Sequence, residues 1–167
     1  TSGCRDPVVE REREVIAHLI FDVQHAGRPS KPGDMGAAYD LDGDGVRGES
    51  GEREVDLVEG YVAAAVERCA ELGLWSTVLR SGEYGARHLQ AATIARGISG
   101  RVAYLACHVN AGGGAYGLVR PDCRSAGGAT LAASIAAALS RLPELQRPGS
   151  LPGCRVEPLY PSAAAAG

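Results

Sequence analysis

The 167-residue sequence has no excess of basic residues, no long apolar run and no closely spaced pair of cysteines. A net charge of -3 with scattered arginines gives little support to nucleic-acid binding. The longest apolar runs fall far short of the roughly 20 residues that span a bilayer, and the polar, acidic N-terminus is unlike a signal peptide. We therefore expect a mature, soluble, monomeric chain of one domain that neither binds nucleic acid nor inserts into a membrane.

The five cysteines do not have the spacing of an all-cysteine zinc site. Cys69 and Cys107 lie in apolar segments, and we expect both to be small buried core residues. Cys123 and Cys154 lie near proline and glycine and can pair or stay free. The sequence therefore leaves the redox compartment open.

Strand-like and helix-like segments alternate along the chain. Strands are predicted over 15–23, 74–79, 101–107, 116–119 and 154–160, and helices over 52–72, 85–98 and 131–142. This alternation predicts an α/β fold with a mostly parallel, twisted sheet covered by helices on both faces. We expect a single domain over residues 1–167, with an N-terminal extension at 1–14 and a segment rich in Pro, Gly and Ala at 143–167.

The segment from Gln24 to Gly51 has little apolar periodicity and predicts a long loop, of a length usually associated with function. Within it, Asp40–Gly45 (Asp-Leu-Asp-Gly-Asp-Gly) resembles the opening of a calcium-binding loop. An EF-hand needs a Glu at the twelfth position, where this chain has Gly51. A solvated turn of Asp and Gly is the expectation that this mismatch favours.

Three separated residues, His25, Glu52 and His108, have the chemistry of a catalytic zinc site. Each histidine directly follows a predicted strand, at the sheet edge where α/β proteins bind ligands. Glu52 lies in the first turn of a predicted helix, three residues before Val55 and therefore on its core-facing side. Two imidazoles and one carboxylate leave the fourth zinc position open for water. We predict that these three residues bind Zn²⁺ at the C-terminal strand edge.

Each of these residues also has an ordinary structural interpretation. A histidine beside a strand end often only makes a hydrogen bond, and the helix dipole favours a Glu in a first turn. Glu49 and Glu54 are alternatives to Glu52, but Glu54 would point roughly 200° around the helix at about 100° per residue. His18, within the first predicted strand, and His88, on the second predicted helix, are expected to be structural.

Four motifs surround the predicted ligands. Asp22–Gly27 is similar to an Asp-x-Gly-His-Gly-Gly motif, Asp34–Ala37 to Asp-x-Gly-Ala, and Ala106–Ala111 to Ser-Ile-His-x-Asn-Ala. Glu52 lies four residues before Asp56-Leu57, similar to a Glu that precedes an Asn-Leu pair. In order and spacing, over residues 15 to 142, the chain resembles the zinc-dependent N-acetylmuramoyl-L-alanine amidases of autolysins and phage endolysins.

This resemblance implies a substrate and roles for several residues. It implies hydrolysis of the peptidoglycan amide bond between the lactyl group of N-acetylmuramic acid and L-alanine. It also implies that His25, Glu52 and His108 are the zinc ligands and that Asn110 contacts the substrate. Zinc suits this reaction because it lowers the pKa of bound water to about 7 and polarises the attacked carbonyl.

The sequence departs from the family at the general acid/base that must move the water's proton. The family has a Glu on a late strand followed by a closing helix, and neither is visible before Gly167. Glu144 and Glu157 are the only carboxylates after Asp122, so the catalytic acid/base stays unassigned. A zinc-containing domain that binds peptidoglycan without cleaving it is therefore the alternative.

A third interpretation is a thiol hydrolase with Cys107 as the nucleophile and His108 as its partner. Adjacent residues of a strand point to opposite faces, which disfavours this pair. The sequence does not distinguish export of the protein from release during host lysis.

Overall fold

The computed structural model describes residues 16–109, 117–121, 126–141 and 154–156. The chain divides into two compact units, Thr1–Ala111 and Gly112–Gly167, which are described separately. The expectation of one amidase-like domain over 1–167 stays a prediction.

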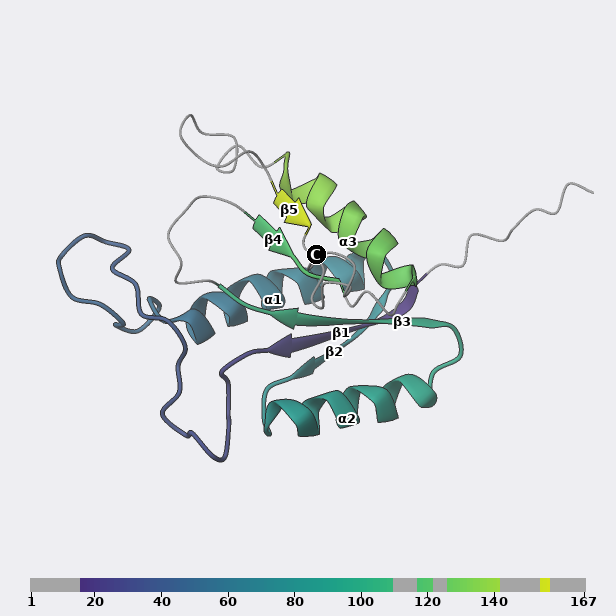
Figure 1. Cartoon of the computed structure of the whole chain (residues 1–167), viewed down its shortest axis with the longest axis horizontal. Helices are drawn as coiled ribbons and strands as arrows, with labels where there is room; N and C mark the ends of the chain where they lie inside the picture. Colours follow the sequence, from purple (N-terminus) through teal and green to yellow (C-terminus); the bar gives the residue numbers. More distant parts are fainter. Residues whose placement is uncertain (1–15, 110–116, 122–125, 142–153, 157–167) are drawn as a thin grey trace, which may run out of the picture. The chain divides into compact units, whose positions relative to one another are not determined.

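The first unit contains a three-stranded, all-parallel sheet with strand order β2-β1-β3 (Figure 1). Its elements are β1 (Ile16–Val23), α1 (Glu54–Glu71), β2 (Trp75–Leu79), α2 (Tyr84–Arg96) and β3 (Arg101–Cys107). The predicted α/β class and the parallel sheet are therefore confirmed. Since β1 is the central strand, the segment that follows it starts from the middle of the sheet edge.

The side chains of β1 alternate between two hydrophobic clusters. Phe21 and Val23 pack with the core-facing residues of α1. Ile20 instead packs with Leu79 of β2 and Ala91 of α2. Because successive strand residues point to opposite faces, the two clusters lie on opposite sides of β1. The residues that α1 contributes are Val55, Val58, Val62 and Cys69.

A fully buried ion pair fixes the C-terminal end of β1. Arg87 of α2 lies 2.7 Å from the Asp22 carboxylate, and neither side chain is exposed to solvent. The same guanidinium donates to the carbonyl oxygens of Val23 (2.6 Å), Gly82 (2.8 Å) and Ala26. Arg87 therefore holds the backbone on both sides of residue 25.

The long loop after β1 caps the start of α1 with backbone carbonyls. The N–H of Glu54 donates to the oxygen of Ala37 at 2.8 Å, and the N–H of Val55 donates to that of Met35 at 3.2 Å. These carbonyls satisfy N–H groups that a helix leaves open at its start, and no side chain caps this helix.

The first turn of α1 differs from the sequence-based expectation. The helix begins at Glu54, and Arg53 before it has an extended backbone with φ of -95° and ψ of 151°. Glu52 therefore precedes the helix instead of lying in its first turn. Helical periodicity counted back from Val55 does not apply to Glu52 for this reason.

The second unit contains β4 (Gly117–Val119), α3 (Ala126–Leu139) and β5 (Cys154–Val156). Strands β4 and β5 pair in parallel, with Gly117 opposite Cys154. Among the residues of α3 whose burial the structure describes, Ala132 and Ala136 are buried. No helix in the described part of the chain is long and apolar enough to cross a membrane.

Candidate metal centre

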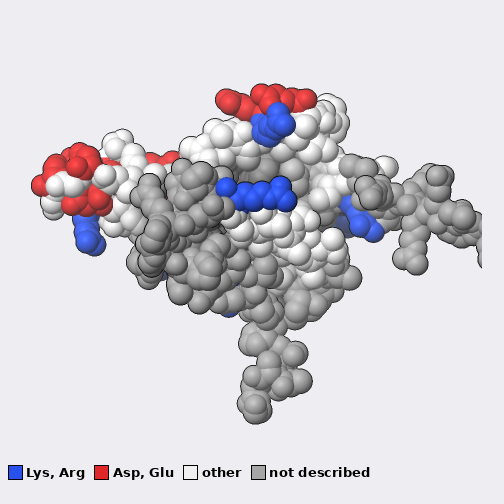
Figure 2. Space-filling model, turned by 90° about the horizontal axis from the view of Figure 1, so that it is seen from above, with Lys and Arg blue, Asp and Glu red and all other residues white. Residues whose placement is uncertain are grey.

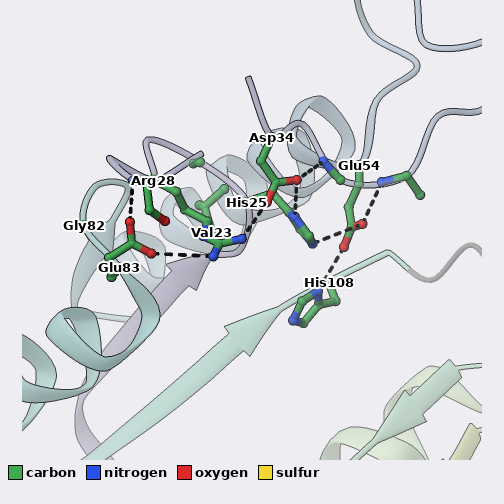
Figure 3. A network of polar contacts seen from close by, with 12 residues as sticks. Val23, His25, Arg28, Asp34, Glu54, Gly82, Glu83 and His108 are labelled. Carbon is green, nitrogen blue, oxygen red and sulfur yellow. Dashed lines mark hydrogen bonds and ion pairs between the residues drawn. The ribbon is translucent and has the colours of Figure 1, made fainter. Parts of the chain in front are cut away.

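The side chains of His25, Glu54 and His108 converge at the carboxyl ends of β1 and β3 and the start of α1 (Figure 3). One potential ligand atom from each residue lies within 4.8 Å of the other two. His25 Nε2 is 3.5 Å from Glu54 Oε2, and His108 Nδ1 is 2.9 Å from Glu54 Oε1. The structure thus brings together the two predicted histidines, with Glu54 as the carboxylate between them.

Glu52, the carboxylate predicted for this site, faces a different part of the chain. Its Oε1 accepts hydrogen bonds from the N–H groups of Leu41 (2.6 Å) and Asp42 (3.2 Å) in the long loop. The sequence did contain a signal for Glu54, which lies four residues before the fully buried Val58 of the core-facing stripe of α1. A residue one helical turn before a core position lies on the same helix face.

The Glu54 carboxylate is buried and held in place by the backbone. It is 5% exposed, and its two oxygens accept hydrogen bonds from the N–H groups of Ala37 (3.0 Å) and Val109 (3.2 Å). Gly36 packs so closely that a Cβ there would lie 2.5 Å from Glu54 Oε2. Only glycine fits at this position, which also has a φ of +73°.

His25 is oriented by a second carboxylate, Asp34. His25 Nδ1 lies 2.9 Å from Asp34 Oδ1, and its Nε2 faces Glu54. Burial alone would raise the pKa of Asp34, but hydrogen bonds from His25, Gly36 and Arg28 outweigh burial and lower this pKa to about 2. An ionised Asp34 accepts the Nδ1 proton and leaves Nε2 free as an acceptor or ligand.

The backbone of His25 has a φ of +66°, and His25 is the one described non-glycine residue with a positive φ. Residues other than glycine avoid this left-handed backbone conformation unless their surroundings impose it. The carbonyl contacts of Arg87 on either side of residue 25 supply such a constraint.

The contacts of Asp34 continue outward to the start of α2 (Figure 3). Arg28 lies 2.6 Å from Asp34 and 3.5 Å from Glu83, and its guanidinium stacks on Tyr84 at 4.4 Å from the ring centroid. Glu83 also accepts a hydrogen bond from the N–H of Ser30 at 2.6 Å. These contacts join the loop after β1 to α2 and hold Asp34 in place.

His108 is the solvent-facing member of the group. Its side chain is 45% exposed, and its ring lies edge-on to that of His25 with centroids 5.7 Å apart. The preceding residue, Cys107, is buried in the α1 cluster, and burial raises the pKa of its thiol. A buried, protonated thiol directed away from His108 is a poor nucleophile, which disfavours the thiol-hydrolase interpretation. Cys69 is buried in the same cluster, so the prediction that both cysteines are core residues is confirmed.

The other two histidines have structural contacts. His18 Nε2 lies 2.8 Å from the hydroxyl oxygen of Thr77, and His88 packs edge-on against the ring of Tyr104. Neither belongs to the potential metal group, in agreement with the expectation for both.

Several residues singled out in the sequence lie outside the described part of the chain. They are Asn110, the predicted substrate contact, the later carboxylates Glu144 and Glu157, and Cys123. Their predicted roles stay predictions.

Comparison of the chain with protein-family models, with curated proteins and with solved structures finds no match. Inference about function therefore rests on the geometry of the site and on the motifs.

Proposed function

We propose that His25, Glu54 and His108 bind a catalytic Zn²⁺ ion. The observation that carries this proposal is the convergence of two imidazoles on one buried carboxylate, with Asp34 behind His25. Ligand atoms of a tetrahedral zinc ion with bonds near 2.0 Å lie about 3.3 Å apart. His25 Nε2 lies 3.5 Å from one oxygen of Glu54 and His108 Nδ1 lies 2.9 Å from the other, so both imidazoles are within reach of an ion held by this carboxylate. In zinc sites, a histidine that binds the ion with one ring nitrogen commonly donates a hydrogen bond from the other nitrogen to a carboxylate.

We further propose that the chain is an N-acetylmuramoyl-L-alanine amidase that acts on peptidoglycan. The contacts between motifs that resemble those of this family support this proposal. Asp34 and Ala37, from the second motif, contact His25 of the first motif and Glu54, respectively. Glu54 also contacts His108 of the last motif. The proposal assigns the ligand role to Glu54 instead of Glu52.

The proposed fold includes helices over both faces of the sheet. The two hydrophobic clusters on opposite sides of β1, one with α1 and one with α2, support this cover. The metal site then lies at the carboxyl edge of the sheet, where open α/β folds bind ligands.

The bound ion would supply an activated water and polarise the carbonyl that is attacked. Other residues of the chain would orient the side chains that bind this ion. By accepting a hydrogen bond from His25 Nδ1, Asp34 holds the proton of that ring on Nδ1. The backbone N–H groups of Ala37 and Val109 fix the Glu54 carboxylate. The exposed His108 leaves the centre accessible to a bulky polymer.

A zinc-containing domain that binds peptidoglycan without cleaving it is the second candidate. It is favoured by one observation within the described residues. Among these residues, the only carboxylates that contact His25 and His108 are Asp34 and Glu54. Asp34 orients His25, and Glu54 has the proposed ligand role. No third carboxylate in contact with these histidines is available to move a proton.

The test combines metal analysis of the full chain with an assay for new L-alanine N-termini released from purified peptidoglycan. We expect one zinc per chain and release that stops on chelation and returns with zinc. His108→Ala is expected to lose both the bound zinc and the release of new N-termini. Glu71→Gln, an exposed change on α1, is expected to keep both.

Unchanged zinc content in both His25→Ala and His108→Ala would contradict the metal centre. Bound zinc with no new N-termini, together with sedimentation of the protein with the cell wall, would favour the binding domain instead.

A further inference from the structure

The loop Asp40–Gly45 brings three carboxylates together, and the proposed amidase function uses none of them. Asp40, Asp42 and Asp44 each offer an oxygen that lies within 4.8 Å of the other two. The turn also has internal hydrogen bonds, from the N–H groups of Gly43 and Gly45 to Asp40. Such bonds also form in turns without an ion, so they do not by themselves indicate a ligand.

A separate observation, on Glu52, does indicate one. Glu52 is 8% exposed, and its Oε1 accepts hydrogen bonds from the N–H groups of Leu41 and Asp42, two neighbouring residues within the acidic loop. The carboxylate therefore points at the loop from the protein side. Its other oxygen, Oε2, is buried and has no hydrogen-bond partner among the described residues. Buried carboxylate oxygens normally have a partner, and a cation bound at the loop would supply one to Oε2.

The charges around the loop also favour a cation. Within the described residues, no ion pair neutralises Asp40, Asp42, Asp44 or Glu52. Acidic side chains gather at the left of the view in Figure 2, the end where the long loop after β1 projects in Figure 1. The three grouped carboxylates, with the Glu52 carboxylate directed at the backbone of the same loop, repel one another unless a cation or protons compensate their charge.

We propose that Asp40, Asp42 and Asp44 bind one Ca²⁺ ion, and that Glu52, which lies outside the group formed by their oxygens, turns its unpartnered oxygen toward the ion on binding. The ligand atoms would all be oxygens, which hard cations such as Ca²⁺ prefer, whereas zinc prefers nitrogen and sulfur. Ca²⁺ takes six to eight oxygens in flexible geometry, so backbone carbonyls and water complete the shell, whereas Mg²⁺ demands a near-ideal octahedron. Counted from Asp40 as the first, Glu52 is the thirteenth residue, one position beyond the EF-hand Glu. The Glu missing at Gly51 is thus supplied by the next residue of a loop that is one residue longer.

The proposed calcium site would stabilise the base of the loop beside the metal centre. The N–H of Tyr39 donates to the oxygen of Glu52 at 2.9 Å, and Ala38 forms a β-bridge with Arg53. Glu54 follows directly after this bridge. A ligand that binds only the folded loop raises the thermal stability of the chain, and the stabilisation grows with the logarithm of ligand concentration above the dissociation constant. This inference does not depend on zinc or on amidase activity.

The test is isothermal titration of the full chain as purified with CaCl₂, with MgCl₂ in parallel. We expect one Ca²⁺ per chain and weaker binding of Mg²⁺. Asp42→Asn and Glu52→Gln should each lower calcium affinity about tenfold or more, because affinity follows the charge of the ligands. Gln at position 52 keeps an oxygen for the amides of Leu41 and Asp42 and replaces only the unpartnered one. Glu71→Gln removes one charge far along α1 and should leave the affinity unchanged.

Absence of calcium binding at millimolar concentration would overturn the proposal. So would wild-type affinity in Asp42→Asn and Glu52→Gln, or an equal loss in Glu71→Gln, which would indicate general attraction to negative charge. If Glu52→Gln fails to fold by circular dichroism, the exposed double change Asp42→Asn with Asp44→Asn decides the question by the same titration.

Discussion

The candidate metal centre and the acidic loop are built in opposite ways. The centre takes His25, Glu54 and His108 from three segments, and 54 positions separate Glu54 from His108. The acidic loop takes Asp40, Asp42 and Asp44 from one short stretch, and Glu52, only eight positions after Asp44, contacts its backbone. A local pattern can be read along the chain, whereas the centre exists only where the sheet and α1 bring distant segments together.

Glu52 and Glu54 show how sharp this difference is. They are separated by one residue, yet Glu52 contacts the acidic loop and Glu54 contacts both histidines. The extended backbone of Arg53 lies between them, so only Glu54 follows the periodicity of α1.

Arg87→Met should have the largest effect, because it leaves Asp22 charged and buried without its partner. Removal of one member of a buried pair costs about 3–5 kcal/mol of unfolding free energy. Urea unfolding of the variant measures this cost. Arg80→Met, which breaks an exposed pair with Glu59, should cost less than about 1 kcal/mol. Equal costs in the two variants would contradict a structural role for the buried pair.

Glu54→Gln should abolish zinc retention, whereas Glu52→Gln should preserve it. The first change removes a charged ligand, and we expect zinc affinity to fall about a hundredfold or more. This loss exceeds the roughly 10–100-fold that is typical when a residue hydrogen-bonded to a metal ligand is changed. Competitive titration with a chelating dye measures the affinity of each variant. If Glu52→Gln loses zinc and Glu54→Gln keeps it, the carboxylate predicted from the sequence is the ligand after all.

Asp34→Asn should have an intermediate effect on zinc and none on the acidic loop. The amide no longer accepts the His25 proton as a carboxylate does, so zinc affinity should fall about 10–100-fold. Chelator competition and calcium titration of the same sample compare the two sites directly. A matching fall in calcium affinity would show that the sites are not independent.

Cys107→Ala should have the smallest effect. The thiol lies in the α1 cluster, on the opposite side of the chain from His108, so zinc content and hydrolysis should not change. We expect a loss of about 1 kcal/mol in unfolding free energy from the reduced packing. Loss of hydrolysis in a variant that folds and retains zinc would restore the thiol as a nucleophile.

Much of the fold could be predicted because it depends on local patterns. Apolar, branched segments and helical spacing located the three parallel strands and the helices between them. The positions of His25 and His108 after strands followed from the same reasoning, since the carboxyl ends of parallel strands share one edge. The start of α1 could not be predicted as well, because backbone carbonyls of the loop cap it and no capping side chain marks it.

By itself, the sequence determined the order of the elements, the two histidines at strand ends and the acidic pattern of the loop. Only the tertiary structure selected Glu54 over Glu52, placed Asp34 behind His25 and directed Glu52 toward the loop. The physical reason lies in the contacts of the long loop. Hydrogen bonds from its backbone decide where α1 begins and which carboxylate it buries, and these contacts join residues too distant in sequence for any local pattern to specify.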